Sequence, residues 1–123
     1  MGFEVISVPG AAIQYSAATR AGAFVFLAGQ ASVDLATGEF VEDSFEGEFR
    51  RTMSNTKAVL KAAGADLTDI VQLSAWLHDE SDLPLFNRLY EEYFSAPYPA
   101  RTNVGNPFTH LKVKIDCVAY VGP

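Results

Sequence analysis

The residues best suited to chemistry lie around Arg101, in the stretch Pro99-Ala100-Arg101-Thr102-Asn103-Val104. A guanidinium group is planar and always charged, so it can bind a carboxylate or a phosphate through two parallel hydrogen bonds. Pro99 stiffens the approach to Arg101, because proline fixes its own φ and restricts the residue before it. The stretch predicts an anion-binding arginine at the start of a short extended run, with a solvated surface arginine as the alternative.

Other residue types that often serve in active sites are few. Cys117 is the only cysteine and has apolar neighbours, which favours a small core side chain over a nucleophile and leaves no cysteine ligand set for zinc. His78 and His110 are far apart and lack ligand-like spacing, so we predict no metal site. Gly29 ends an apolar run, where its backbone could face a ligand or could merely permit a bend or bulge.

Three extended runs are expected to begin the chain. They cover residues 3–8, 13–19 and 24–30, and the first is ended by Pro9-Gly10. The second run contains Tyr15. The second and third runs are predicted to form a β-hairpin around a turn at Arg20-Ala21-Gly22.

Two amphipathic helices are expected further along the chain. The first covers residues 43–63, with Asp43 as its capping residue and Gly64 as its stop. The second is capped by Asp82 and ends before Pro97. Each helix has one apolar face, which is typical of a helix docked on a sheet.

Apolar and polar side chains alternate in two further strands, 70–77 and 111–121. One apolar face of each strand is predicted to lie under the helices. The opposite face carries Ile70, Gln72, Ser74 and Trp76 from the first strand and Lys112, Lys114, Asp116, Val118 and Tyr120 from the second. Lys114 and Asp116 are therefore expected to share a face of the sheet.

The predicted order β-β-β-α-β-α-β indicates a single α+β domain over residues 1–123, with two helices on one face of a mixed β-sheet. The uncovered face would expose Ile70, Trp76, Val118 and Tyr120 to water. This is a large apolar area for a monomer. We therefore predict a homo-oligomer whose sheets face inward.

The composition narrows the classes of function. The chain has 123 residues, the size of one domain, and a formal net charge of −6. Nucleic-acid binding requires a basic surface that replaces counterions on phosphates, so we expect no nucleic-acid partner. The N-terminus lacks the segments of a signal peptide, and no apolar run is long enough to span a membrane. We expect a soluble, cytoplasmic protein without a membrane partner.

From about Ala12 to Tyr120 the chain resembles the RidA family, the YjgF-like reactive intermediate (imine) deaminases. Each matching segment is short, but together they follow the order and spacing of the family and are specific for its fold. The segments are Tyr15-Ser16, Phe26-Leu27-Ala28-Gly29-Gln30, Thr37-Gly38-Glu39, Thr56-Lys57-Ala58-Val59-Leu60 with Ala62-Ala63-Gly64, Phe86-Asn87-Arg88-Leu89-Tyr90 with Tyr93-Phe94, and Pro99-Ala100-Arg101-Thr102.

The resemblance implies a chorismate-mutase-like fold and a homotrimer with clefts between its subunits. It implies hydrolysis of reactive 2-enamine and 2-imino acids to 2-keto acids and ammonia, with no metal and no organic cofactor. By the same resemblance, Arg101 would clamp the carboxylate of a small substrate. Tyr15 and Asn87 would line the cleft, and Gly29 and Asn103 would contribute backbone contacts.

The last strand departs from the family, which supplies an acidic residue there to place water or accept its proton. Aligned through the segment 115–119, Lys114 takes that place, whereas an ungapped count from Arg101 gives Asp116. We favour the first alignment, although both side chains could reach the cleft. Three functions stay open. The first is an imine deaminase in which Asp116 or a water does the work of the acid. The second is a paralogue that binds a diacid or another anion-rich ligand through Arg101 and Lys114, and the third is a non-catalytic carboxylate-binding or interaction subunit.

Overall fold

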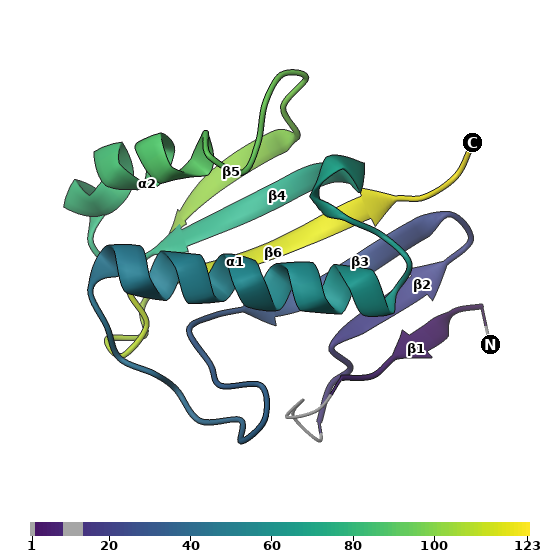
Figure 1. The fold of residues 1–123 in the computed structure, drawn as a ribbon, viewed down its shortest axis with the longest axis horizontal. Helices are drawn as coiled ribbons and strands as arrows, with labels where there is room; N and C mark the ends of the chain where they lie inside the picture. Colours follow the sequence, from purple (N-terminus) through teal and green to yellow (C-terminus); the bar gives the residue numbers. More distant parts are fainter. Residues whose placement is uncertain (1, 9–13) are drawn as a thin grey trace.

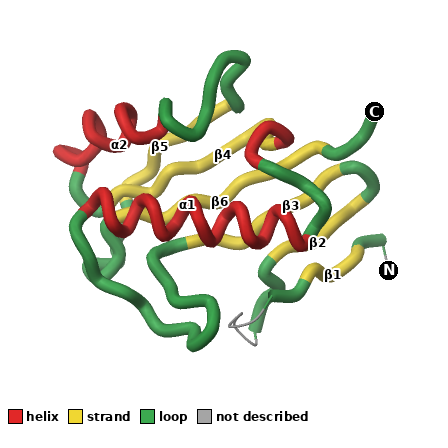
Figure 2. The backbone as a smooth tube through the Cα atoms, viewed as in Figure 1, coloured by secondary structure: helices red, strands yellow, loops and turns green. Residues whose placement is uncertain are grey.

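The computed structural model describes residues 2–8 and 14–123. Within them, six strands form one sheet in the order β1-β2-β3-β6-β4-β5, and both helices lie on the same face of it (Figures 1 and 2). β4 and β5 pair in parallel, and the other neighbouring strands are antiparallel. In chain order the elements are β1 (Glu4–Ile6), β2 (Ala18–Ala21), β3 (Phe24–Gln30), α1 (Phe45–Ala62), β4 (Ile70–Leu77), α2 (Leu83–Tyr90), β5 (Ala100–Gly105) and β6 (Val113–Tyr120), with short 3₁₀ helices at Leu67–Asp69 and Glu80–Asp82.

The predicted α+β class, with both helices on one face, is confirmed. The predicted order lacked one strand, because the extended run at Arg101 forms the separate edge strand β5. The predicted hairpin is β2–β3, but β2 begins only at Ala18, so Tyr15 precedes the strand. The turn consists of Gly22, whose φ is 60°, and Ala23, because Arg20 and Ala21 of the predicted turn belong to β2. The break at Pro9-Gly10 and the start of the second run at Ile13 lie outside the described residues.

Local hydrogen bonds set the two ends of α1. Its N-cap is Ser44, whose hydroxyl accepts a hydrogen bond from the Gly47 N–H at 3.1 Å, so the prediction of Asp43 as the cap is wrong. Asp43 instead accepts from the backbone N–H of Ser44 at 2.7 Å. At the other end, Gly64 has a φ of 77°, the left-handed conformation that ends helices, as predicted.

α2 is shorter than the sequence suggested. Asp82 is the N-cap residue, as predicted, but its side chain makes no capping hydrogen bond. The helix ends at Tyr90, and the N–H groups of Tyr93 and Phe94 donate to the Tyr90 carbonyl at 3.0 Å in a closing turn. Among the described residues, neither helix combines the length and the apolar composition needed to cross a membrane.

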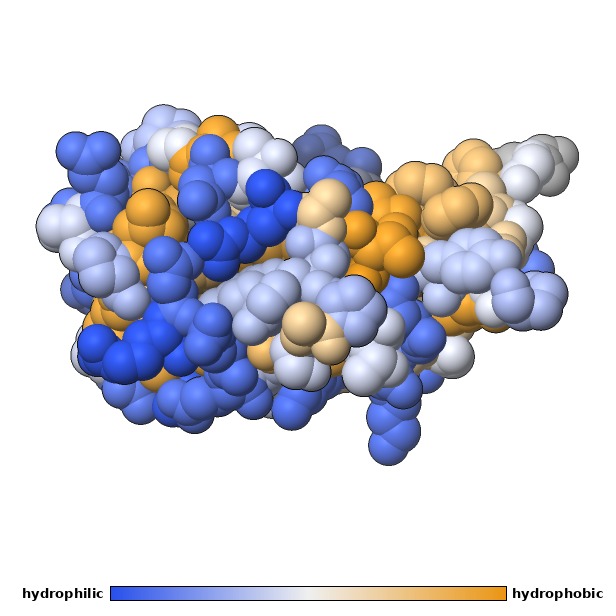
Figure 3. All heavy atoms as spheres, turned by 90° about the horizontal axis from the view of Figure 1, so that it is seen from above, coloured by the Kyte–Doolittle hydropathy of each residue, from blue (hydrophilic) through white to orange (hydrophobic). Residues whose placement is uncertain are grey.

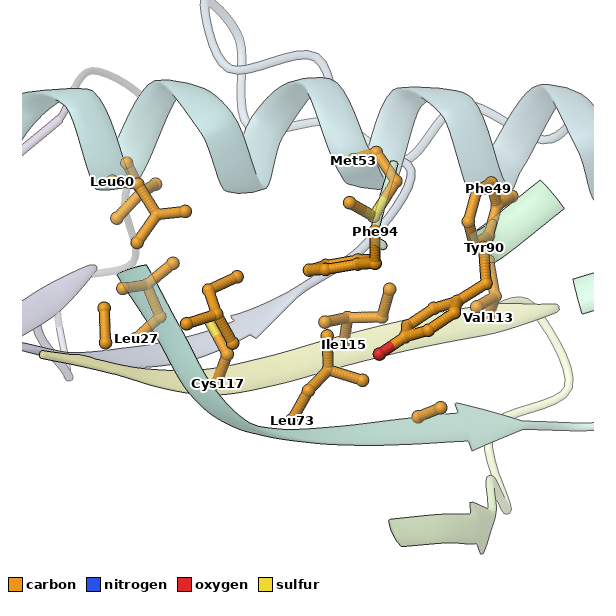
Figure 4. Close-up of a cluster of buried hydrophobic side chains, with 14 of the residues drawn as sticks. Leu27, Phe49, Met53, Leu60, Leu73, Tyr90, Phe94, Val113, Ile115 and Cys117 are labelled. Carbon is orange, nitrogen blue, oxygen red and sulfur yellow. The ribbon is translucent and has the colours of Figure 1, made fainter. Parts of the chain in front are cut away.

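The hydrophobic core lies between the helices and the sheet (Figure 4). Residues from α1 and from the covered face of the sheet pack against each other there, and burial of each large apolar side chain contributes about 1.5–3 kcal/mol. Cys117 is part of this core and is 3% exposed, and burial raises the pKa of its thiol to about 12. The prediction of a core cysteine is confirmed. The labelled core residues are Leu27, Phe49, Met53, Leu60, Leu73, Tyr90, Phe94, Val113, Ile115 and Cys117.

The opposite face of the sheet exposes apolar side chains. Phe24, Phe26 and Val71 are 43%, 44% and 44% exposed, respectively. Ile70 is buried, which reverses the predicted faces of Ile70 and Val71, because the β4–β6 register shifts between Ile70 and Gln72. Figure 3 shows the molecule from above relative to Figure 1, and on that side hydrophobic surface lies among hydrophilic residues.

Candidate functional site

Arg101 lies on the edge strand β5 with its side chain on the helix-covered face of the sheet. It pairs with Leu73, whose side chain is fully buried beneath the helices. The Arg101 Nη2 atom donates a hydrogen bond to Oδ1 of Asn87, on α2, at 2.6 Å. The guanidinium carbon lies 4.7 Å from the ring centre of Tyr90 and 5.2 Å from that of Phe86. One amide and two aromatic rings therefore hold the guanidinium in place.

A surface pocket of about 400 Å³, here called the arginine pocket, surrounds this guanidinium. Its one acidic lining residue, Glu91, accepts a hydrogen bond from the Tyr98 hydroxyl at 3.4 Å, and no ion pair among the described residues includes Arg101. Burial raises the pKa of the Tyr90 hydroxyl, although the Arg101 charge works against this. The pocket thus presents a fixed cation with unused donors. Its lining is Asn87, Tyr90, Glu91, Tyr98, Pro99 and Arg101.

A second pocket, here called the lysine pocket, has a volume of about 350 Å³ and brings Tyr15, Gly29 and Lys114 together. Among the described residues that line it, Lys114 is the only charged one. The ammonium nitrogen of Lys114 lies 4.8 Å from the ring centre of Trp76 and 5.7 Å from that of Phe108. The remaining lining residues are Val8, Ala17, Gln30, Ala31, Val33, Leu35, Gly38, Phe40 and Leu111.

Gly29 makes room for the Lys114 side chain. The β3–β6 register shifts between Leu27 and Gln30, so Gly29 lies in a strand irregularity. This agrees with the alternative that the glycine permits a bend or bulge. A Cβ atom at Gly29 would lie 3.1 Å from Cδ of Lys114, closer than an ordinary contact. The absence of a side chain therefore lets the stem of the lysine pack against the β3 backbone.

Asp116 and Lys114 lie on the same face of β6, as the alternation predicted, because Val113, Ile115 and Cys117 are buried on the other. The Oδ2 atom of Asp116 accepts a hydrogen bond from the indole Nε1 of Trp76 at 2.7 Å. Trp76 thus contacts both side chains, one through its N–H and the other through its ring. The sequence indicated only an apolar residue here, since this contact depends on the β4–β6 pairing register.

The predicted site residues fall into separate places within one subunit. Asn87 and Arg101 share the arginine pocket, while Tyr15, Gly29 and Lys114 share the lysine pocket. Asn103 joins neither of these; it lines a hollow of about 240 Å³ with Leu77, Glu80, Leu83, Val104 and Gly105. Arg101 lies on the helix-covered face of the sheet and Lys114 on the opposite face, here called the open face. The two cations therefore do not meet inside one subunit.

Glu48 is a positioning residue that sequence reasoning missed. It is 1% exposed, and its carboxylate accepts from the backbone N–H of Lys112 at 3.1 Å and from the Lys112 ammonium at 3.2 Å. It also accepts from the backbone N–H of Asp43 at 3.2 Å. A charge buried this deeply is stable only when its partners satisfy it, so Glu48 ties α1 to the segment just before Lys114.

The two histidines lie in different settings. His78 Nδ1 is 2.9 Å from the backbone oxygen of Asn106, and the His110 ring packs against Phe40 with ring centres 4.8 Å apart. Within residues 2–8 and 14–123, no three His, Cys, Asp or Glu side chains come together as metal ligands.

Comparisons with known proteins agree with the resemblance. A family model described as "Endoribonuclease L-PSP" matches residues 5–121. A RutC family protein of Pyrococcus horikoshii is 37% identical over 108 residues, which is 86% of each chain. A Homo sapiens protein named 2-iminobutanoate/2-iminopropanoate deaminase is 32% identical over 117 residues, 94% of this chain and 85% of the relative. The crystal structure of RidA from an Antarctic Psychrobacter superposes with a TM-score of 0.82 at 31% identity, covering 98% of this chain and 99% of that chain.

Proposed function

The chain belongs to the L-PSP family, also called the YjgF/RidA family, and from this premise we propose that it hydrolyses reactive 2-imino and 2-enamino acids to 2-keto acids and ammonia. Several relatives carry the name of a 2-iminobutanoate/2-iminopropanoate deaminase. The single observation that carries the proposal for this chain is the fixed, unneutralised guanidinium of Arg101. Its guanidinium is fixed by Asn87 at 2.6 Å and by two aromatic rings, and no carboxylate of the described chain neutralises it.

A guanidinium prepared in this way suits the carboxylate that every 2-imino acid carries. The planar fork binds a carboxylate through two parallel hydrogen bonds, which fixes the direction of the adjacent C=N bond. Asn87 would hold the fork in one orientation. In this proposal the arginine pocket is the carboxylate-binding half of the site.

The second half of the site would come from a neighbouring subunit. Arg101 and Lys114 lie on opposite faces of one sheet, and the open face exposes Phe24, Phe26 and Val71. A homotrimer with its open sheet faces turned inward would bury these side chains and bring one subunit's arginine pocket to the next subunit's lysine pocket. Tyr15 and Gly29 would then line the same cleft as Arg101 and Asn87.

The reaction needs a positioned water and two proton transfers. Water adds to the imine carbon while one of its protons passes to the imine nitrogen. In the resulting carbinolamine the hydroxyl proton then passes to the same nitrogen as the C–N bond breaks, which releases ammonia and leaves a C=O bond. Asp116 is the carboxylate proposed to receive the proton from water and return it to the leaving nitrogen. Trp76 would orient it by donating to Oδ2 at 2.7 Å, which leaves Oδ1 to face the water.

The test generates imines from several amino acids with an amino acid oxidase and traps the remainder with semicarbazide. We expect the wild type to deplete the imine, and Arg101→Ala to lose at least about 100-fold in kcat/KM, as expected for removal of one partner of a charge pair. Arg88→Ala, which removes an exposed arginine one residue after Asn87, is the matched control and should behave like the wild type. Depletion by Arg101→Ala at the wild-type rate would refute the assigned role.

A non-catalytic carboxylate-binding protein is the second candidate, and one feature of β6 favours it. Lys114 stands where the resemblance calls for an acidic residue, and Asp116 already accepts a hydrogen bond from Trp76. If the wild type binds 2-keto acids in calorimetry but leaves every imine untouched, the binding role replaces the deaminase. Arg101→Ala should then abolish the binding and leave the oligomer intact.

A further inference from the structure

The lysine pocket carries a positive charge that no carboxylate of the described chain compensates. Lys114 is its only charged lining residue, and none of the ion pairs found in residues 2–8 and 14–123 includes it. The protein has a net charge of −6, so this cation is not part of a generally basic surface. An uncompensated charge in a concave site favours an occupant of opposite sign.

The described residues around Lys114 hold it without using its hydrogen-bond donors. Its nitrogen lies over the rings of Trp76 and Phe108, which attract a cation through their faces. Asp116, on the same face of β6, bonds to Trp76 and forms no ion pair with Lys114. The three ammonium N–H donors therefore stay available for an anion.

The walls of the pocket suit one small acidic group on a short chain. Of the described lining residues, only Tyr15 and Gln30 have polar side chains besides Lys114, and Gln30 Nε2 donates to the Ala28 carbonyl at 3.0 Å. The volume of about 350 Å³ is near the lower end for ligand sites, and a carboxylate with one or two methylenes fills only part of it, so the pocket admits either chain length.

The loop that follows β5 supplies part of the surroundings of Lys114. Phe108 reaches the ammonium group, and its backbone N–H donates to Oδ1 of Asn106 at 3.2 Å. Asn106 is 4% exposed and also donates through Nδ2 to the carbonyl of Leu111 at 2.9 Å. This buried amide fixes the loop, so Phe108 is held beside Lys114.

We propose that Lys114 binds the side-chain carboxylate of a dicarboxylic substrate, so that the enzyme prefers imines of acidic amino acids over imines of neutral ones. The proposal rests on the proposed function, in which Arg101 of the adjoining subunit binds the other carboxylate. A lysine is a compact charge on a flexible stem. It suits a carboxylate whose position changes when the substrate is one methylene longer.

The test compares kcat/KM for imines generated from aspartate and glutamate with kcat/KM for imines generated from alanine and methionine. In Lys114→Met, which keeps the length of the side chain and removes its charge, the ratio of acidic to neutral imine turnover should fall about 10- to 100-fold. Lys61→Met removes an exposed lysine on α1 away from the lysine pocket and should keep the wild-type ratio.

A binding arm separates this inference from the proposed function. Calorimetry with 2-oxoglutarate and with 2-oxobutanoate measures selectivity for a second carboxylate without any turnover. One outcome is that the wild type hydrolyses no imine and still binds 2-oxoglutarate more tightly than 2-oxobutanoate, with Lys114→Met losing this difference. In that case the deaminase proposal fails and the lysine subsite stands.

An unchanged ratio together with unchanged 2-oxoglutarate affinity in Lys114→Met would overturn the inference. If Lys114→Met in addition lowers the melting temperature of the oligomer, a carboxylate of a neighbouring subunit is the partner of Lys114. The role of Lys114 is then in assembly.

Discussion

The arginine and lysine pockets hold their cations in similar ways but on opposite faces of the sheet. Arg101 lies over Phe86 and Tyr90, and Lys114 lies over Trp76. Arg101 is also held by the amide of Asn87 at 2.6 Å, whereas Lys114 forms no hydrogen bond through its ammonium within the described residues. The fixed, planar cation suits the carboxylate that all 2-imino acids share, and the flexible cation suits a group that varies between substrates.

The largest effect is expected from Arg101→Lys, which keeps the charge and removes the planar fork. We expect kcat/KM for imine hydrolysis to fall about 100-fold, because a single ammonium cannot bind the carboxylate bidentately. The reciprocal change, Lys114→Arg, should alter kcat/KM for acidic imines less than about 5-fold. Equal losses of kcat/KM in the two variants would mean that the two pockets do not differ in their need for a planar guanidinium.

A smaller loss is expected from Asn87→Asp, which changes one atom of the side chain that braces Arg101. A carboxylate 2.6 Å from Nη2 would pair with the guanidinium and compete with the substrate. We expect affinity for 2-oxobutanoate, measured by calorimetry, to drop about 10-fold. Asn87→Ala, which removes the brace without adding a competing charge, should lose less; the opposite ranking would contradict a substrate carboxylate at this guanidinium.

The lysine pocket is tested by Gly29→Ala. The new Cβ would lie 3.1 Å from Cδ of Lys114, so the lysine stem must shift slightly and its ammonium is displaced relative to the Trp76 ring. The preference for acidic imines should fall about 3-fold, a fraction of one charged hydrogen bond. Gly105→Ala is the matched control, because an added Cβ there meets no atom within 4 Å; a similar loss in both variants would exclude an effect through Lys114.

The smallest effect on activity is expected from Tyr90→Phe. The ring stays beneath Arg101, so kcat/KM should change less than about 2-fold. The Tyr90 hydroxyl is buried without a hydrogen-bond partner in the described chain, so its removal should leave the free energy of unfolding unchanged or raise it by about 1 kcal/mol. Urea denaturation measures this, and a loss of 2 kcal/mol or more would show that the hydroxyl is bonded in the assembled protein.

Patterns that depend on neighbours along the chain predicted the structure well. The period-two alternation of β6 placed Lys114 and Asp116 on one face and Cys117 in the core, and both placements are confirmed. The faces of Ile70 and Val71 were wrong because a register shift leaves no mark in the sequence. Asp43 was predicted as the cap of α1, but the neighbouring Ser44 takes this role, which only the backbone geometry shows.

The contacts between the site residues were harder to predict than the residues themselves. Arg101 was singled out from its chemistry, but the face on which it lies depends on its pairing with Leu73 and on the packing of α2. Trp76 contacts both Lys114 and Asp116 only because β4 and β6 pair in a particular register. Such contacts join residues far apart in the chain, so local patterns do not contain them.

The most direct test asks whether one site is built from two subunits. Arg101→Ala and Asp116→Ala are co-expressed with different tags, and mixed oligomers are purified through both tags. In a mixed trimer one of the three clefts regains an intact Arg101 facing an intact Asp116, so about one third of wild-type hydrolysis should return although each variant alone is nearly inactive. Mixed trimers as inactive as the parent variants would contradict the account.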